Sequence, residues 1–430
     1  MPRIAISPRS ASIDDPVSIV VSDVEPGSRV RLRLRNHSLN AEAFAEFIVS
    51  SSGKVDVAQQ APVAGDYEGV DPSGLFWSAQ FDPGSDVTSM VEVLAQLEPL
   101  AYTLSATAPD ESVTTEHFSR LLLASNIDVA TVREGQLRGT LFAPRGAADA
   151  PGVIVLGGSD GGNLWQFIAA FLAKYGYVAL SLPYFAFEDL PGELVEIPLE
   201  YFGEGIRWLR DRPEVDPGRV GVLGMSRGGE AALLIGASFT DVAAVVALVP
   251  SGVTGGGIGA DLSAMGRSAW TLDGAPFDVF PPPGDPVTFQ EAQGAVTAGK
   301  PFAGAGAIIR ALERAGDRIN EVSIPVERTN GAIFMMSGED DQLWASSRLA
   351  EVAERRLRSR SFPHPYEHHR YEDTGHFGCL LPNLPSTSSA GRHPVVPLSL
   401  AFGGTPKGNA AASADLWPRI VAFLHKHLQT

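Results

Sequence analysis

The chain has a single cysteine, Cys379, among 430 residues, so no internal disulfide can form. A lone thiol suits a reducing compartment, and we expect a cytoplasmic protein. The sequence also lacks an uncharged apolar run of the about eighteen residues that a membrane-spanning helix requires. Its first residues contain no apolar core of a secretory signal peptide. We therefore predict neither a disulfide-stabilised domain nor a membrane span.

Positive charge is also scarce. The sequence has 33 lysine and arginine residues against 50 aspartate and glutamate residues, which gives a net charge of −17, and five residues in all are lysine. Nucleic acids and anionic membranes bind to basic surfaces, so we expect neither as a partner. An anionic small molecule needs only a local basic patch, which would consist mainly of arginine.

Residues 1–125 predict an all-β domain. Short segments such as 17–21 and 30–35 are separated by turns such as Glu25-Pro26-Gly27, and in 30–35 every second side chain is apolar. This period of two is typical of half-buried antiparallel strands. No long helical stripe interrupts the pattern, and 114–125 is the last expected strand. We predict an immunoglobulin-like β-sandwich.

Residues 126–430 have the pattern of an α/β domain, which together with the N-terminal part agrees with the two or three domains expected at this length. Buried strands alternate with helices, which implies a mostly parallel sheet that is covered on both faces. Residues 251–330 are rich in glycine and proline, fit this pattern poorly and are interpreted as a cap or insertion. The expected strands are 137–142, 153–156, 177–182, 220–224, 242–249, 331–336 and 366–371, and the expected helices are 165–174, 199–212, 230–239, 345–358 and 414–428.

The motif Gly-x-Ser-x-Gly occurs twice, around Ser159 and around Ser226. It marks a sharp strand-to-helix turn whose small flanking residues leave the serine Oγ exposed. In α/β-hydrolases this turn follows the central strand, two βα units after the loop that supplies the first oxyanion-hole amide. Ser226 follows the later strand and is the predicted nucleophile. Ser159 lies where the oxyanion loop belongs, so its backbone N–H and that of Arg227 are the predicted oxyanion donors.

The general base should be a histidine that follows the serine in sequence. His376 lies in the small-residue turn 373–378, after the expected strand 366–371, where a loop can return an imidazole to the serine. His425 and His427 belong to the terminal helix and are expected at the surface. His364, His368 and His369 lie close together in or next to one expected strand. Because His368 and His369 face opposite sides of that strand and no cysteine is near, no metal site is predicted.

The triad acid should follow the strand that precedes His376, where its carboxylate can orient the imidazole. Glu339, Asp340 and Asp341 all follow the expected strand 331–336. Spacing alone does not choose among them, and two of the three could instead cap the next helix.

Several blocks of the sequence follow one another in a recognisable order: 67–77, 138–142, 187–191, 224–230, 338–341 with Trp344, 374–376 and 423–428. Together they resemble the type-I acyl-CoA thioesterases and the related bile acid-CoA:amino acid N-acyltransferase. The resemblance covers nearly the whole chain, except much of 251–320. It implies that Asp341 is the triad acid and that an acyl thioester is hydrolysed through an acyl-serine. The transferases of that family carry cysteine at the nucleophile, so Ser226 favours water as the acceptor.

We therefore expect a serine hydrolase that cleaves a thioester of coenzyme A or of an acyl-carrier protein, with no cofactor. One alternative is an acyltransferase that passes the acyl group to an amine or alcohol. In 251–330, Arg267 and Arg310 are the candidates for an anion clamp that would bind glycine or taurine, and no other obvious clamp stands out. Further alternatives are a carboxylester or lactone hydrolase, which would use the same triad, and a binding protein on an inactive hydrolase scaffold.

Overall fold

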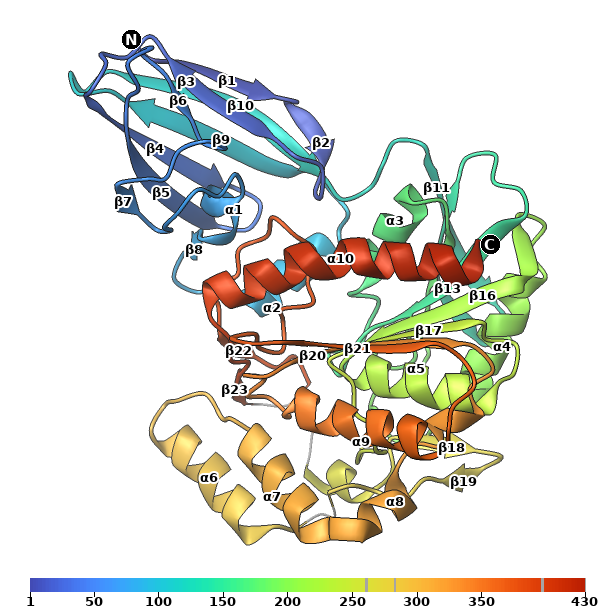
Figure 1. Ribbon diagram of the computed structural model, residues 1–430. Helices are drawn as coiled ribbons and strands as arrows, with labels where there is room; N and C mark the ends of the chain where they lie inside the picture. The colour runs from blue at the N-terminus through green and yellow to red at the C-terminus, as the bar shows by residue number, and fades with distance from the viewer. Residues whose placement is uncertain (260–261, 282–283, 396–397, 430) are drawn as a thin grey trace.

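The computed structural model describes residues 1–259, 262–281, 284–395 and 398–429. Figure 1 shows two parts, a blue and cyan body of strands at the N-terminus and a larger body of strands and helices. The described residues contain no helix that combines the length and the apolar character needed to cross a membrane.

The N-terminal part consists of two sheets. One has three strands in the order β1-β3-β6, and the other has seven, β2-β10-β9-β4-β5-β7 with β8 paired to β5. In β4, buried and exposed side chains alternate as its sequence predicts. The bounds are β1 Arg3–Ser7, β2 Ser10–Ser12, β3 Ser18–Ser22, β4 Arg29–Asn36, β5 Ala41–Ile48, β6 Val55–Asp56, β7 Ala64–Gly65, β8 Gln80–Phe81, β9 Leu100–Thr107 and β10 Val113–Leu121.

Two short helices, α1 (Gly74–Trp77) and α2 (Val87–Leu94), interrupt these strands, which the sequence pattern did not predict. Asp86 caps the start of α2. Its side chain accepts hydrogen bonds from the Thr88 and Ser89 amides, and the Ser89 hydroxyl oxygen accepts one from the Asp86 amide. This capping box stabilises a helix of eight residues, whose buried side chains Val87, Met90, Val91 and Leu94 have the i, i+3, i+4, i+7 spacing of an amphipathic helix.

The second part contains an eight-stranded sheet in the order β11-β12-β14-β13-β16-β17-β20-β21. The six strands β14, β13, β16, β17, β20 and β21 are parallel to one another. Strand β12 is antiparallel to β14, and β11 is antiparallel to β12. This mostly parallel sheet confirms the predicted α/β class. The bounds are β11 Ile127–Glu134, β12 Leu137–Pro144, β13 Ala150–Leu156, β14 Val178–Ser181, β16 Val215–Met225, β17 Ala244–Leu248, β20 Ala332–Gly338 and β21 Tyr366–Tyr371.

Helices cover both faces of this sheet, as predicted (Figure 1). One face packs with α3 (Gln166–Lys174) and α10 (Pro406–Leu428) in one hydrophobic cluster. The other face packs with α4 (Leu199–Arg210), α5 (Arg227–Ser238) and α9 (Ser346–Ser359) in a second cluster.

Two helices begin earlier than the sequence predicts. Helix α5 begins at Arg227, directly after Ser226. The sequence pattern placed its start too late, because glycines in the first turn hide the apolar periodicity. Helix α10 begins at Pro406, whose fixed φ suits a first helical position, and the Thr405 side chain caps it by accepting from the Gly408 amide. Small and polar residues dominate the first two turns of α10, so the hydrophobic pattern marks only its second half.

The segment 251–330 combines short strands and helices with irregular stretches among its described residues. It contains β18 (Trp270–Leu272) and β19 (Ala275–Pro276), which form a small sheet with β15 (Ile197–Pro198). Its helices α6 (Pro286–Thr297), α7 (Ala305–Ala315) and α8 (Ile319–Val322) lie at the bottom of Figure 1. Side chains of α7 and α9 share a third hydrophobic cluster, which attaches this segment to α9.

Candidate active site

Ser226 lies at the end of β16 in a strained turn. Its backbone has φ 58° and ψ −119°, a conformation that costs a non-glycine residue about 1–3 kcal/mol. A Cβ atom on Gly224 would lie 1.9 Å from the Gly228 carbonyl oxygen, and one on Gly228 would lie 2.2 Å from the Gly157 carbonyl oxygen. The flanking glycines therefore permit the turn that presents Ser226 at the carboxyl end of β16.

The structure brings the three predicted triad side chains together. His376 Nε2 lies 3.0 Å from Ser226 Oγ, and His376 Nδ1 lies 2.8 Å from Asp341 Oδ2. Exposed fractions are 4% for Ser226, 3% for Asp341 and 2% for His376, so water competes little for these hydrogen bonds. This geometry allows Nδ1–H to donate to the carboxylate while Nε2 accepts the serine proton.

The three adjacent acids have different surroundings. Asp341 Oδ1 accepts hydrogen bonds from the Leu343 and Trp344 amides, so this residue also caps a turn. Asp340 instead accepts from the Gly404 amide, and Glu339 accepts from the Ser347 hydroxyl. Asp341 is therefore the carboxylate that faces His376.

The pKa of Asp341 is lowered. Burial opposes its ionisation, but the His376 imidazole and nearby hydrogen-bond donors outweigh that effect and hold the pKa below its ordinary value. The Asp341 carboxylate is therefore charged at neutral pH, as a residue that stabilises an imidazolium must be.

The Gly-x-Ser-x-Gly turn around Ser159 lies beside the turn around Ser226. It follows β13, which pairs with β16, and a Cβ atom on Gly158 would lie 3.3 Å from the Ser226 Cβ atom. The Arg227 amide is the first of helix α5, and such an amide has no acceptor within its own helix. The predicted oxyanion donors, at Ser159 and Arg227, thus belong to two segments that both adjoin Ser226.

Ser159 also has a histidine partner, which sequence reasoning missed. His393 Nε2 lies 2.9 Å from Ser159 Oγ. The Val395 amide donates to His393 Nδ1 at 3.2 Å, so in the neutral ring Nε2 carries the proton. Burial, followed by the proximity of His376, lowers the pKa of His393 to about 4, so the ring is neutral at physiological pH.

These contacts distinguish the two serines. The histidine beside Ser226 is supported by a carboxylate, which makes its facing nitrogen an acceptor. The histidine beside Ser159 is supported by an amide donor, which makes its facing nitrogen a donor that cannot take the serine proton. No local sequence signal separates these cases, because Ser159 and His393 are 234 positions apart.

The remaining histidines lie away from this centre. His368 contacts the Ser337 hydroxyl and the Glu354 carboxylate, whereas His369 stacks on Phe334. They face different neighbours, as predicted, and the described residues contain no group of three or more His, Cys, Asp or Glu placed to hold a metal ion. His427, expected at the surface, is half-buried and its ring packs against the Phe423 ring.

Comparison with known proteins identifies the family. Residues 197–430 match the family model for the BAAT/acyl-CoA thioester hydrolase C-terminal region, and residues 14–134 match the acyl-CoA thioester hydrolase/BAAT N-terminal region. The chain belongs to the acyl-CoA thioester hydrolase/BAAT family. This confirms the resemblance found in the sequence.

Curated relatives align over almost the whole chain. Acyl-coenzyme A thioesterase 1 of Mus musculus is 30% identical over 96% of this chain and 94% of its own. Peroxisomal succinyl-coenzyme A thioesterase of Mus musculus is 29% identical with the same coverage of both chains. Mitochondrial acyl-coenzyme A thioesterase 2 of Homo sapiens is 30% identical over 96% of this chain and 82% of its own.

Residues next to the family block 187–191 contact the loop that carries Ser159. The Gly162 amide donates to the Phe185 carbonyl, and a Cβ atom on Gly161 would lie 2.8 Å from the Ala186 Cβ atom. The segment 185–191 thus packs against the end of the loop that carries Ser159.

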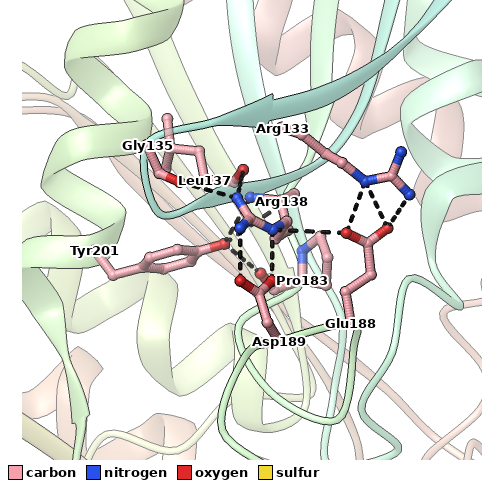
Figure 2. Close-up of polar contacts among 8 residues, drawn as sticks. All are labelled: Arg133, Gly135, Leu137, Arg138, Pro183, Glu188, Asp189 and Tyr201. Carbon is pink, nitrogen blue, oxygen red and sulfur yellow. Dashed lines mark hydrogen bonds and ion pairs between the residues drawn. The ribbon is translucent and has the colours of Figure 1, made fainter.

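Two arginines of the β11–β12 hairpin hold this block in place (Figure 2). Arg138 binds Asp189 through two hydrogen bonds of 2.6 and 2.7 Å, and Arg133 binds Glu188 through Nε at 2.9 Å and Nη2 at 2.5 Å. The Tyr201 hydroxyl donates to the Pro183 carbonyl at 2.7 Å beside them. These bidentate pairs hold the acidic block next to residues 185 and 186, which contact the loop that carries Ser159.

A buried ion pair joins the Ser226 turn to the segment 251–330. The Arg227 guanidinium bonds to Glu230 at 2.6 Å and to the Gly256 carbonyl at 2.9 Å. Glu230 also accepts from the Gly255 amide and from Trp270 Nε1. Burial raises the pKa of Glu230, which the Arg227 charge opposes. The Arg227 side chain is thus engaged in structure, while its amide remains at the start of α5.

The N-terminal family block also reaches the active-site loops. The Ser386 amide donates to the Trp77 carbonyl at 3.0 Å, and the Thr387 hydroxyl donates to the Ala79 carbonyl at 2.7 Å. Trp77 is itself anchored by a 2.8 Å bond from Nε1 to Asp71. The block therefore contacts the segment that connects the His376 loop to the hairpin bearing His393.

Proposed function

We propose that this chain hydrolyses acyl-coenzyme A thioesters through an acyl-serine on Ser226. The observation that carries the proposal is the hydrogen-bonded series Ser226–His376–Asp341, buried at the carboxyl end of the sheet. Membership of a family whose named relatives are acyl-coenzyme A thioesterases gives the substrate class.

The acylation step follows from the hydrogen bonds. Ser226 Oγ attacks the thioester carbonyl carbon as His376 Nε2 takes its proton, and Asp341 stabilises the resulting imidazolium. The tetrahedral oxyanion accepts hydrogen bonds from the amides of Arg227 and Ser159. Collapse breaks the carbon–sulfur bond, and the departing thiolate takes the proton from His376.

Deacylation repeats the sequence with water. His376 Nε2 removes a proton from water as its oxygen attacks the acyl-serine carbonyl. The second oxyanion forms at the same two amides. Cleavage of the ester bond returns the proton to Ser226 Oγ and releases the free acid.

Water, rather than an amine, is the proposed acceptor. A serine ester reacts less readily with amines than a thioester does, and Ser226 replaces the cysteine of the transferases. Arg267 and Arg310, the arginines that sequence analysis considered as an anion clamp, bind Glu196 and Glu291 at 2.6 and 2.7 Å. Their charges are thus already paired with carboxylates. A cytoplasmic location stays a prediction, since named relatives include mitochondrial and peroxisomal proteins.

The test combines turnover, labelling and product analysis. A panel of acyl-coenzyme A substrates and simple esters is assayed for free thiol and acid, with the Ser226→Ala variant as the inactive form. We expect wild-type turnover, loss of turnover in the variant and loss of covalent labelling by a fluorophosphonate. Labelling that survives Ser226→Ala would refute the nucleophile. Mass spectrometry with millimolar glycine or taurine should show free acid, and a majority of N-acyl amide would refute water as the acceptor.

A further inference from the structure

The Ser159 hydroxyl has a hydrogen bond whose direction is fixed. Because the Val395 amide occupies His393 Nδ1, the Nε2–H group donates to Ser159 Oγ. The serine oxygen is the acceptor in this contact, so the Ser159 proton is available to donate to a third group. A hydroxyl that accepts one hydrogen bond is a stronger donor in the next.

The position of Ser159 indicates what that third group is. Its loop abuts Ser226, since a Cβ atom on the preceding Gly158 would lie 3.3 Å from the Ser226 Cβ atom. The oxyanion of an acyl transfer at Ser226 forms between this loop and the Arg227 amide. We propose that the Ser159 hydroxyl donates a hydrogen bond to that oxyanion in addition to the two amides, and that His393 is its positioning residue.

The loop that carries Ser159 is rigid enough for this role. The Tyr184 hydroxyl donates to the carbonyl oxygens of Gly157 and Gly158 at 2.8 and 3.1 Å. The adjacent Asp160 carboxylate accepts from Trp165 Nε1 at 2.6 Å. Donors that are fixed before the reaction stabilise the oxyanion without a cost of reorganisation.

His393 is held on a separate support. It follows β22 (Ala390–Arg392), which pairs with β23 (Ser399–Ala401). A Cβ atom on Gly391 would lie 2.8 Å from the Thr88 hydroxyl and 3.0 Å from the Asp86 carboxylate of α2. The N-terminal part of the chain therefore contacts the hairpin that orients Ser159, which gives that part a direct connection to the active site.

This inference rests on the proposed acyl transfer at Ser226, and isosteric variants test it. Ser159→Thr keeps a hydroxyl. Ser159→Val gives a side chain of the same shape as threonine, with a methyl group in place of that hydroxyl. We expect kcat of the Val variant to fall about 10- to 100-fold below that of the Thr variant, with KM changed less than about threefold. Equal kcat values for the two variants would overturn the proposal, as would a loss confined to KM.

The histidine is tested by a matched pair. His393→Gln retains an amide donor that can reach Ser159, and His393→Phe does not. We expect the Gln variant to retain most of the wild-type kcat and the Phe variant to approach Ser159→Val. Ser388→Ala is the control, because it removes a hydroxyl that bonds within the same hairpin, to the Ala390 carbonyl, and should leave kcat near the wild-type value. A His393→Phe variant with wild-type kcat would overturn the positioning role.

Covalent labelling separates this inference from the proposed function. The rate of fluorophosphonate attachment to Ser226 depends on the oxyanion donors but not on the natural substrate. Ser159→Val should still become labelled, at a rate about 10- to 100-fold lower than Ser159→Thr. If wild-type protein is labelled but hydrolyses no acyl-coenzyme A, the proposed substrate is wrong. If thioesters are hydrolysed and both Ser159 variants are labelled at equal rates, the Ser159 inference is wrong.

Discussion

Ser226 and Ser159 show how one residue type acquires two different roles. Both occupy Gly-x-Ser-x-Gly turns after adjacent parallel strands, and both lie within hydrogen-bond distance of a histidine. The difference lies at Nδ1 of each histidine, which faces the Asp341 carboxylate in His376 and the Val395 amide in His393. The protonation of the imidazole, and not the motif, therefore decides which serine can lose its proton.

The choice of Asp341 over its neighbour gives a first prediction. Asp341→Asn should lower kcat by about 10⁴-fold, as in a serine-protease triad, because the amide no longer holds the required imidazole tautomer. Asp340→Asn should have a far smaller effect, since Asp340 bonds to the Gly404 amide. Steady-state kinetics of both variants, with melting temperatures to confirm folding, provide the measurement. A larger loss in Asp340→Asn would contradict the assignment.

Asp160 gives a second prediction, on pH. Burial, partly offset by the Trp165 indole donor, raises the pKa of Asp160 to about 6, above the value of about 3.9 in an unfolded chain. A raised carboxyl pKa contributes stability that is fully present below pH 4 and is lost as the pH rises through 6. Asp160→Asn removes this loss, so it should stabilise the protein at pH 8 relative to wild type.

The effect of Asp160→Asn should disappear near pH 4, where the wild-type carboxyl is protonated in the folded protein. Urea unfolding at the two pH values measures the difference, which should not exceed about 3 kcal/mol because one pKa unit corresponds to about 1.4 kcal/mol. An equal change in the free energy of unfolding at both pH values would mean that the effect does not come from ionisation.

At the scale of elements, helix α5 connects the nucleophile to the rest of the site. Its first residue supplies the proposed oxyanion amide, and its first turn contains the Arg227–Glu230 ion pair. Through Trp270 and Gly255, Glu230 ties this turn to the segment 251–330. The buried pair thus makes the position of that segment dependent on the nucleophile turn.

Breaking this pair gives a third prediction. Glu230→Leu leaves the Arg227 charge buried without its carboxylate, which should lower the free energy of unfolding by about 3–5 kcal/mol. The double variant Arg227→Met/Glu230→Leu removes both charges and should recover much of that loss. Glu351→Gln is the control, because its pair with Arg348 is exposed and 3.8 Å long and should contribute less than about 1 kcal/mol. A double variant less stable than Glu230→Leu would contradict the explanation.

At the scale of the molecule, the N-terminal and catalytic parts share one hydrophobic cluster. It contains Phe47 and Phe118 of the N-terminal sheets together with Phe171 of α3 and Trp417 of α10. Polar contacts cross the same boundary, since Lys174 Nζ lies 2.7 Å from Asp14 Oδ1. A continuous core of this kind favours cooperative unfolding.

A fourth prediction follows for the whole chain. We propose that the two parts unfold in a single transition, and that Lys174→Met lowers its midpoint without dividing it, because the remaining apolar contact still couples them. Differential scanning calorimetry of the full chain measures this. Two resolved transitions in the wild-type protein would show that the shared cluster does not couple the parts.

Local pattern was sufficient for much of the fold. Period-two alternation predicted β4, buried apolar runs predicted the parallel strands, and motif and order predicted Ser226 and His376, two of the three residues that the structure brings together. These features depend on neighbours along the chain, which the sequence displays directly. The first half of α10 lacks an apolar stripe, so its Thr405 cap, and not hydrophobic periodicity, marks its beginning. Helix α2 has both signals, a side-chain cap and apolar residues at helical spacing, but it is only eight residues long.

The sequence by itself determined that this is a hydrolase-type α/β chain with two candidate serines, and sheet order singled out Ser226. Residue spacing left three adjacent carboxylates open, and the family resemblance selected Asp341. The tertiary structure showed that Asp341 faces His376, and it alone revealed the contact of His393 with Ser159. Both depend on side chains that are distant in sequence, 35 positions for Asp341 and His376 and 234 for Ser159 and His393. Hydrogen-bond partners at such separations are chosen by the direction of backbone loops after the sheet has formed, and no local pattern of residues encodes that direction.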